Sequence, residues 1–308
     1  MRTEKMSDRI AVRLEEIAGT DKVLRDAPMS KYTSFRAGGK ADLLVNVSSG
    51  EDLQQILQFL SSEGIAHMIL GNGSNVLVRD GGYRGVIVRI GEAFNYMRIE
   101  DCALVCGSGV SLAMAAKAAA NAALTGLEFA SGIPGSVGGG VFMNAGAYGG
   151  ELKNVLKSTA LITGDGTAFA QASAEELEMG YRHTRLHESG EIVLEAVFEL
   201  EPGDPKEILA LMADLTARRN EKQPVTYPSA GSFFKRPEGY FAGKMIQDAG
   251  LKGLSVGGAQ VSQLHSGFII NTGGASATDI LQLMQIVQAR VLDQFGVLLE
   301  PEVRIIGE

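Results

Sequence analysis

The chain has 308 residues, a formal net charge of −8 and a pI near 5.2. This length predicts two or three packed units, and 45% apolar residues suffice for a sizeable core. The acidic balance argues against nucleic-acid or anionic-membrane binding through bulk charge. The charged N-terminal segment is unlike a signal peptide and no stretch has the length of a membrane span, so we expect a soluble cytoplasmic protein without a membrane or obligate protein partner.

The predicted elements begin with a small α/β unit. An amphipathic helix opens the chain, and the segment 30–47 is strand-like but broken by Gly38 and Gly39. Residues 49–64 fit a capped helix whose apolar side chains share one face. Three short apolar strands follow within 67–90, separated by the sequences GNGSN and DGG.

The middle of the chain is richer in strands. Residues 97–126 predict two strands, a GSG turn and an alanine-rich helix, and 160–170 predict a hairpin that turns at Asp165-Gly166. A further strand is expected over 192–201. Mixed strands with few helices favour an α+β fold over a doubly wound sheet.

The last third differs in composition. The strongest linker signal is Pro202-Gly203-Asp204-Pro205. From Arg218 to Lys252 there are seven Lys or Arg residues against three acids, a local positive cluster in an acidic chain. A long helix is predicted over 277–294, and the chain closes with a strand-like segment over 297–306.

A glycine-rich tract over 131–150 is the most informative feature, with eight glycines in twenty residues. It is too glycine-rich for an ordinary helix or strand interior, which indicates backbone shaped around a ligand. Glycine amides can approach an anion closely, so the tract could line a pyrophosphate. A flexible linker is the alternative, but embedded side chains such as Ile133, Val137 and Phe142 favour burial.

Cysteines and histidines offer little chemistry. Cys102 and Cys106 stand in a predicted strand with three residues between them, where they would share one face, and core packing is the favoured interpretation. His183 and His187 are the closest histidine pair. Without a carboxylate set nearby, no metal site is expected.

A second glycine loop, GNGSN over 71–75, precedes the tract by about sixty residues. Neither loop fits a P-loop, and the GxG of the first lacks the third glycine and following helix of a Rossmann turn. Two such loops in mixed α/β context predict a different dinucleotide fold, which holds its cofactor between subdomains.

Six motifs, taken in order, resemble those of the UDP-N-acetylenolpyruvoylglucosamine reductase family. They are YTSFRAGGKAD, LGNGSNVLV, SGIPGSVGG with MNAGAYGGE, GYRHT, YPSAGSFFKRP and LEPEVRIIGE. The resemblance is to the compact variety, without an inserted substrate loop. It implies an α+β fold: an FAD-binding domain of the vanillyl-alcohol oxidase type over 1–204, with subdomains of about 1–95 and 96–204, then a smaller α/β substrate-binding domain over 205–308 whose last strand returns toward the active site.

The activity implied by the resemblance is NADPH-dependent reduction of UDP-N-acetylglucosamine enolpyruvate to UDP-N-acetylmuramate, in peptidoglycan precursor synthesis. NADPH would reduce a non-covalent FAD, and the reduced flavin would deliver hydride to the enolpyruvyl group. The matching motifs imply these flavin contacts: Thr33, Ser34, Gly71, Asn72, Gly73, Ser74, Asn75, Gly132, Ile133, Pro134, Gly135, Ser136 and Gly139.

Three catalytic residues are implied by the same motifs. Ser232 matches the family's proton donor to the α-carbon, and Arg182 matches the arginine that meets the substrate carboxylate. Glu302 matches the acid that hydrogen-bonds the enolate. Glu300, two residues away, should share its strand face, and motif register favours Glu302.

The resemblance also implies a set of substrate contacts near the basic cluster, for which a solvated charged face is the alternative. They are Tyr181, Lys222, Tyr227, Lys235, Arg236, Tyr240, Gln260 and Asn271.

Two other functions stand beside the reductase: an FAD-dependent oxidase of small alcohols or sugars, and a non-catalytic nucleotide-sugar-binding protein. The oxidase is disfavoured because the chain has no convincing histidine for covalent flavin attachment. The binding protein is disfavoured because it leaves both glycine loops unexplained.

Overall fold

In the computed structural model, which describes residues 2–308, the chain passes repeatedly between two units. Unit 1 comprises the residues up to Arg25, Leu43–Asn72 and Gly85–Arg218. Unit 2 comprises Asp26–Asp42, Gly73–Arg84 and Arg219–Glu308. Among residues 2–308, no helix combines the length and apolar character needed to cross a membrane.

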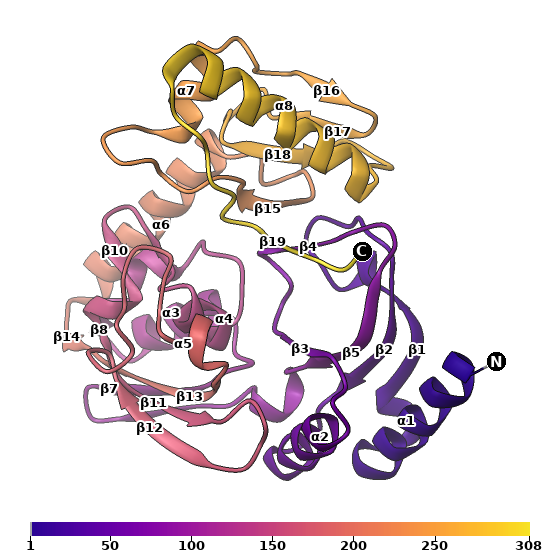
Figure 1. The fold of residues 1–308 in the computed structure, drawn as a ribbon. Helices are drawn as coiled ribbons and strands as arrows, with labels where there is room; N and C mark the ends of the chain where they lie inside the picture. Colours follow the sequence, from indigo (N-terminus) through magenta and orange to yellow (C-terminus); the bar gives the residue numbers. More distant parts are fainter. Residues whose placement is uncertain (1) are drawn as a thin grey trace. The chain divides into compact units, whose positions relative to one another are not determined.

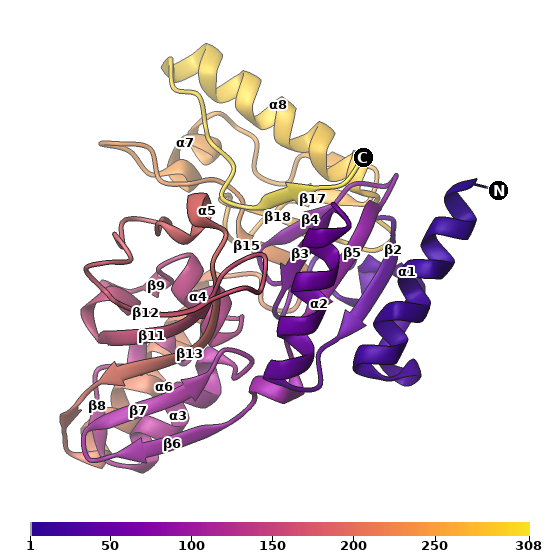
Figure 2. The same ribbon diagram turned by 60° about the horizontal axis from the view of Figure 1, so that its bottom comes forward.

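The first core of unit 1 forms between two helices and a sheet. Helices α1 (Arg2–Ala18) and α2 (Gly50–Ser62) lie side by side (Figure 2). Unit 1 holds the larger part of a sheet with the strand order β1-β2-β5-β3, in which β3 and β5 are parallel. These strands are β1 (Val23–Pro28), β2 (Lys40–Asn46), β3 (His67–Leu70) and β5 (Tyr83–Arg89).

Helix α2 forms where the sequence predicts it. Ser49 caps it, because its Oγ accepts a hydrogen bond from the backbone N–H of Asp52 at 3.0 Å. Its apolar face buries Leu53, Ile56 and Leu57 completely against the sheet. The predicted period and cap are thereby confirmed.

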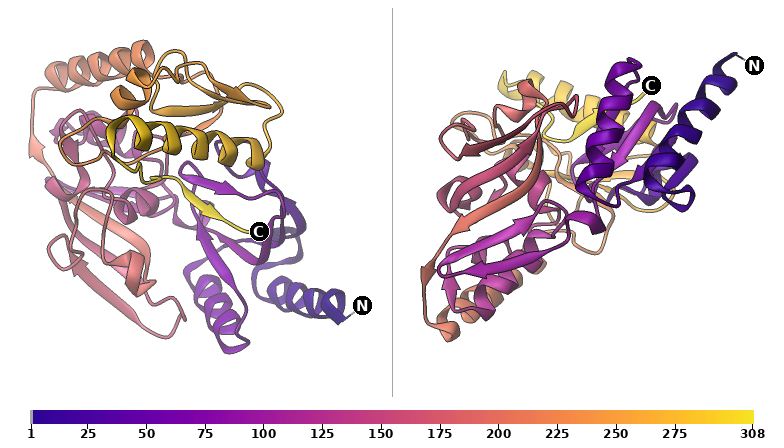
Figure 3. Two further views of the ribbon diagram at one scale, coloured as in Figure 1. Left: turned by 45° about the horizontal axis from the view of Figure 1, so that its top comes forward. Right: turned by 90° about the horizontal axis from the view of Figure 1, so that it is seen from below.

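The second core of unit 1 surrounds an antiparallel sheet with the order β12-β11-β13-β7-β6, whose central strands lie side by side in the right-hand view of Figure 3. Its strands are β6 (Met97–Glu100), β7 (Ala103–Gly107), β11 (Leu156–Ile162), β12 (Phe169–Ser173) and β13 (Ile192–Glu199). Helices α3 (Leu112–Asn121), α4 (Val137–Phe142) and α5 (Leu186–Ser189) belong to this part.

Short elements complete unit 1. Two-residue strands pair as β8 (Leu124–Thr125) with β14 (Glu201–Pro202) and β9 (Gly146–Ala147) with β10 (Gly150–Glu151). Within residues 2–308, 3-10 turns form at Thr20–Lys22, Glu92–Phe94, Glu128–Ala130 and Leu152–Asn154 in unit 1 and at Met29–Lys31 in unit 2.

Unit 2 is built on an antiparallel sheet with the order β15-β18-β17-β16, crossed on one face by α8 (Figure 1). Its strands are β15 (Ser229–Ser232), β16 (Ser255–Val256), β17 (Ala259–Val261) and β18 (Phe268–Asn271). A parallel pair joins β4 (Val76–Val78) to β19 (Arg304–Ile306). The helices are α7 (Ala242–Asp248), α8 (Ala277–Phe295) and the end of α6 (Pro205–Lys222).

Two carboxylates fix the start of α8. Ser276 and Asp279 form a capping box. Asp80, which follows β4, also accepts hydrogen bonds from the backbone N–H groups of Ala277 and Thr278 at 2.8 and 2.7 Å. Burial alone would raise the pKa of Asp80, but these bonds and one from the Thr278 hydroxyl hold it below its usual value of 3.8. The loop after β4 is therefore anchored to α8.

Two predicted strands are shorter than expected. Residues 32–37 turn tightly instead of extending, since Arg36 adopts φ +52° and its N–H donates to the Thr33 carbonyl, so β2 begins only at Lys40. Cys102 lies in a turn before β7, because Asp101 takes φ +53°. The prediction that Cys102 and Cys106 share one face of a strand is thus wrong.

The prediction of core packing is confirmed for Cys106, which is fully buried in β7.

Candidate functional site

The two glycine loops meet within unit 1. A Cβ on Gly71 would collide with the Oγ of Ser136 and push it aside, so glycine allows this close approach of the GNGSN loop to the GIPGSVGG loop. The same Oγ accepts a hydrogen bond from the N–H of Gly139 at 3.4 Å and caps α4. A contact over sixty residues of sequence therefore joins both predicted flavin loops.

The glycine-rich tract contains a short helix, contrary to the prediction from its composition. Helix α4 tolerates its glycines because they serve close packing: a Cβ on Gly138 would lie 2.8 Å from the Cβ of Ser108. Val137 and Val141 on the same helix are completely buried, so the linker interpretation is wrong.

One buried hydroxyl marks the tract as a polar cradle. Ser131 Oγ, next to the predicted contacts Gly132–Ser136, is shielded from solvent and has no hydrogen-bond partner within residues 2–308. A buried hydroxyl without a partner is costly, and a bound polar group would satisfy it. Together with the meeting of the two glycine loops at Gly71 and Ser136, this unpartnered hydroxyl fits a cofactor with phosphate and ribose oxygens such as FAD.

In unit 2, the rest of the GNGSN loop packs on the YTS turn. A Cβ on Gly73 would collide with the Tyr32 carbonyl, and the N–H of Ser34 donates to the Gly73 carbonyl at 3.1 Å. Thr33 is buried and its hydroxyl donates to Met29 O at 3.2 Å. These predicted flavin contacts form one rigid group of turns.

The structure brings Ser232 and Glu302 together in unit 2. The N–H of Glu302 donates to the carbonyl of Phe233, the residue after Ser232, at 2.8 Å. Asn75, from the predicted flavin loop, donates from Nδ2 to the Glu302 carbonyl at 3.1 Å. Its own carbonyl accepts from the N–H of Arg304 at 3.0 Å. Backbone and Asn75 hydrogen bonds therefore join a flavin-loop residue to the backbone of Glu302 and to that of Phe233, the neighbour of Ser232.

The segment before β19 is not the predicted strand. Regular pairing begins at Arg304, and Pro301 makes only an isolated bridge to Phe234. The N–H of Lys235 donates to the Glu300 carbonyl at 2.9 Å and that of Glu302 to the Phe233 carbonyl at 2.8 Å, on either side of this bridge, so the shared face of Glu300 and Glu302 stays a prediction. Glu300 is exposed, and its carboxylate lies 3.4 Å from the ammonium of Lys235.

Arg182 belongs to unit 1, at the tip of a turn closed by Gly180 and His183. Its φ of +54° is rare for a side chain of this size. The guanidinium donates to the carbonyls of Gly146 at 3.2 Å and Asn144 at 3.5 Å, and lies 5.1 Å from the ring of Tyr181. The glycine-rich tract thus positions this arginine.

Asn144, which supports Arg182, is completely buried. Its Nδ2 donates to Glu151 at 2.8 Å and to the Gly180 carbonyl at 2.9 Å. Its Oδ1 accepts from the N–H of Lys153 at 3.0 Å. Sequence reasoning missed Asn144, although it stands in the quoted MNAGAYGGE motif.

The predicted substrate contacts of unit 2 differ in their surroundings. Lys222 at the end of α6 and Tyr240 are exposed, and Arg236 stacks on Phe241 at 4.5 Å. Gln260 uses its amide within the sheet edge, donating to Gly253 O at 3.3 Å and to the Ser255 hydroxyl at 2.9 Å.

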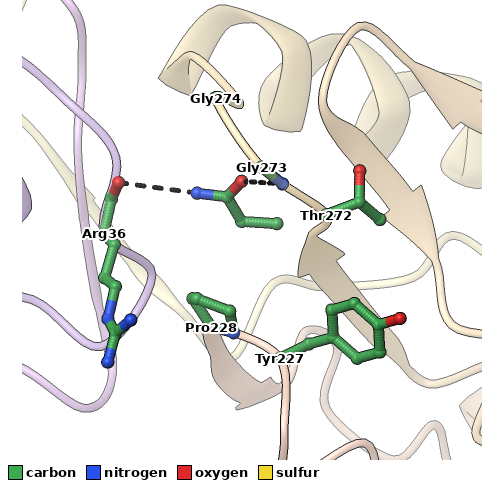
Figure 4. A pocket seen from close by; sticks show the side chains of 7 residues that line it. Arg36, Tyr227, Pro228, Thr272, Gly273 and Gly274 are labelled. Carbon is green, nitrogen blue, oxygen red and sulfur yellow. Dashed lines mark hydrogen bonds between the residues drawn. The ribbon is translucent and has the colours of Figure 1, made fainter.

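A pocket of about 310 Å³ lies in unit 2 (Figure 4). Its walls are Arg36, Tyr227, Pro228, Asn271, Thr272, Gly273 and Gly274. Tyr227 and Asn271 were predicted as substrate contacts. Arg36 was not predicted as a substrate contact, although it stands in the quoted YTSFRAGGKAD motif; it adopts a positive φ.

The histidine pair lies beside the glycine-rich tract. The rings of His183 and His187 are 5.5 Å apart, and His187 stacks on Phe142 at 4.1 Å. A nitrogen of His187 lies 3.0 Å from the Phe142 carbonyl. In the part of the chain that the structure describes, no group of three or more His, Cys, Asp or Glu residues is arranged to hold a metal.

Comparison with known proteins assigns this arrangement. Residues 223–306 match the family described as UDP-N-acetylenolpyruvoylglucosamine reductase, C-terminal domain, and residues 41–170 match an FAD binding domain. The UDP-N-acetylenolpyruvoylglucosamine reductase of Clostridioides difficile (strain 630) is 47% identical over 299 residues, covering 97% of this chain and 98% of the relative. The chain belongs to the UDP-N-acetylenolpyruvoylglucosamine reductase family.

Two further members of the reductase family agree. The one from Alkaliphilus oremlandii (strain OhILAs) is 48% identical over 295 residues, covering 96% of this chain and 97% of the relative. The crystal structure of the one from Thermus caldophilus superposes with a TM-score of 0.80 at 35% identity, covering 93% of this chain and 98% of that chain. The predicted family, α+β fold with FAD-binding and substrate-binding parts, FAD cofactor and reductase activity in peptidoglycan synthesis are confirmed.

Proposed function

We propose that Ser232, Glu302 and Arg182 carry out the reduction of UDP-N-acetylglucosamine enolpyruvate in this member of the reductase family. The network from Asn75 through Glu302 to the backbone after Ser232 is the observation that carries the proposal. It supports placing a proton donor and a carboxyl group beside a flavin loop.

The cofactor fits two groups of residues. In unit 1, Gly71, Asn72 and the loop from Gly132 through Ile133, Pro134 and Gly135 to Ser136 and Gly139 would hold FAD, with Ser131 as an additional hydroxyl. In unit 2, Thr33, Ser34, Gly73, Ser74 and Asn75 would hold it. When bound, FAD supplies the hydride that it receives from NADPH.

The chain's own groups manage charge and protons. Hydride addition to the terminal carbon leaves negative charge on the α-carbon and its carboxylate. The fork of N–H donors on Arg182 would bind that carboxylate, and a protonated Glu302 would donate a hydrogen bond to the same enolate. The Ser232 hydroxyl would then give its proton to the α-carbon.

Besides Arg182, substrate binding would draw on the positive cluster and neighbouring polar residues of unit 2 and on Tyr181 of unit 1. Lys222, Lys235 and Arg236 suit the diphosphate, since each carries a cation on or near the surface. The remaining proposed contacts are Tyr181, Tyr227, Tyr240, Gln260 and Asn271. The ion pair of Lys235 with Glu300 would open when phosphate binds.

We further propose that the functional domains are 1–204 and 205–308, and that the enzyme works in the cytoplasm without an obligate protein partner. The nicotinamide would use the enolpyruvyl pocket in turn with the substrate. A complex in which NADPH and the enolpyruvyl sugar are both productively bound would contradict this order.

Anaerobic visible spectroscopy tests the catalytic assignment. Yellow protein should bleach with NADPH and regain its colour with UDP-N-acetylglucosamine enolpyruvate. Ser232→Ala should bleach at nearly the wild-type rate but recover far more slowly. The exposed Ser62→Ala in α2 serves as a matched control that should do both. Equal loss of both steps in Ser232→Ala would remove the proton-donor role.

A further inference from the structure

Arg36 is held in a conformation that its own backbone disfavours. A left-handed φ of +52° costs a residue with a Cβ about 1–2 kcal/mol, and it persists only where the surroundings enforce it. Here Phe35 and Ala37 on either side are buried in the core of unit 2, while Arg36 itself is exposed. The fold therefore fixes the place from which this guanidinium extends.

Asn271 is hydrogen-bonded to the three segments that line the pocket, which are Arg36, Tyr227–Pro228 and Thr272–Gly274. Its backbone N–H donates to the Pro228 carbonyl at 2.9 Å. Its Nδ2 donates to the carbonyl of Phe35 at 3.0 Å. The same nitrogen donates to the carbonyl of Arg36 at 3.5 Å, and its Oδ1 accepts from the N–H of Gly273 at 2.9 Å; these two bonds are the dashed lines in Figure 4. Asn271 is only 5% exposed, and these bonds occupy its amide. Hydrogen bonds within the chain therefore hold the walls of the pocket in place.

The chemistry of the walls selects an anion with a flat ring. Arg36 is the one charged residue among the seven that line the pocket, and none is acidic. Tyr227 is 48% exposed and offers a ring face, while Gly273 and Gly274 leave their wall bare of side chains. A guanidinium binds phosphate oxygens in pairs, and an aromatic ring packs against a base.

We propose that this pocket binds a nucleoside phosphate, with Arg36 at the phosphate and Tyr227 beside the base. A volume of about 310 Å³ is at the lower end for ligand pockets and suits one nucleotide. The proposal rests on the proposed function, whose ligands all carry nucleotides. The nucleoside phosphate in this pocket would be the adenylate of FAD, the phosphorylated adenylate of NADPH or the uridylate of the substrate.

Three measurements on Arg36→Gln distinguish these sources. They are the Kd of FAD for the flavin-free protein, the rate of flavin bleaching with NADPH relative to NADH, and the Kd of UDP by calorimetry. One of the three should weaken about ten- to a hundredfold, as expected for a lost charged hydrogen bond, with the other two within about twofold. Arg36→Lys should lose less, and Arg13→Gln in α1 is the control.

Arg36→Gly separates charge from backbone strain, since glycine accepts a positive φ freely. It should fold at least as stably as wild type yet show the same selective loss as Arg36→Gln. The proposal is overturned if no measurement changes by more than twofold in either variant, or if Arg36→Gly binds all three ligands normally. The Kd of UDP can be measured without turnover. If the wild-type protein failed to reduce the enolpyruvyl sugar, the proposed function would fail, while the UDP measurement would still test the pocket.

Discussion

Gly231 lies in a bulge of β15, directly before the proposed proton donor Ser232. Ser229 pairs with Ile270 and Ser232 with Phe268, so three steps along β15 match two along β18. Gly231 stands in this irregularity at φ +78°, and a Cβ there would meet no atom within 4 Å. Bulges redirect side chains next to active sites, which predicts that Gly231→Ala disturbs the proton donor without a clash.

The magnitude follows from the backbone alone. Alanine at a left-handed φ costs about 1–2 kcal/mol, and open space adds no steric cost. Gly250→Ala is the matched control, because Gly250 has φ +72°, equally open surroundings and a position after α7. Both variants should lose that stability, and each kcal/mol should lower Tm by about 2–4 °C.

Stopped-flow spectroscopy of the two half-reactions is the assay. Gly231→Ala should bleach with NADPH at nearly the wild-type rate and recover about tenfold or more slowly with the enolpyruvyl sugar, since about 1.4 kcal/mol of barrier is tenfold in rate. Gly250→Ala should match wild type in both steps. Equal recovery rates in Gly231→Ala and Gly250→Ala would refute the role of the bulge.

Three further predictions concern stability, the flavin loops and the cysteines. Asp80→Asn should destabilise the fold by about 1 kcal/mol near neutral pH, because asparagine loses the negative charge at the helix N-terminus and one of the two acceptor oxygens. Because the folded pKa of Asp80 lies below its unfolded value, wild type should lose this advantage only as pH falls below about 4, so equal urea midpoints at pH 7 would contradict it. Gly71→Ala should weaken FAD binding by pushing away Ser136 Oγ, and a double-mutant cycle with Ser136→Ala should show part of the loss relieved; purely additive losses would argue against the contact. Burial raises the pKa of Cys106 to about 12, so iodoacetamide at pH 8 should modify Cys102 first, and preferential labelling of Cys106 by mass spectrometry would disprove this.

Local chemistry made much of this fold readable from the sequence. The cap at Ser49 and the apolar period after it define α2, because both act within a few residues. The Asp165-Gly166 turn between β11 and β12 is equally local, with Gly166 at φ +72°. The family motifs gave the cofactor and the reaction for the same reason, since each is a short contiguous string.

Contacts between distant segments were decided by the tertiary structure. Composition argued against a helix in the glycine-rich tract, but α4 forms there because its glycines let it pack against Ser108. Motif register chose Glu302 over Glu300, yet the difference in their surroundings arises from pairing with residues 233–235.

The positive φ of Arg36 and the role of Asn271 could not be read from neighbouring residues either. The side chain of Asn271 donates to the carbonyl of Phe35, 236 positions earlier in the chain. The sequence by itself determined the family, the cofactor and the reaction, because capping, turn and motif signals act over a few residues. Only the tertiary structure decided which of them share a hydrogen-bonded network or a pocket wall, since buried polar groups must find partners wherever the fold brings them.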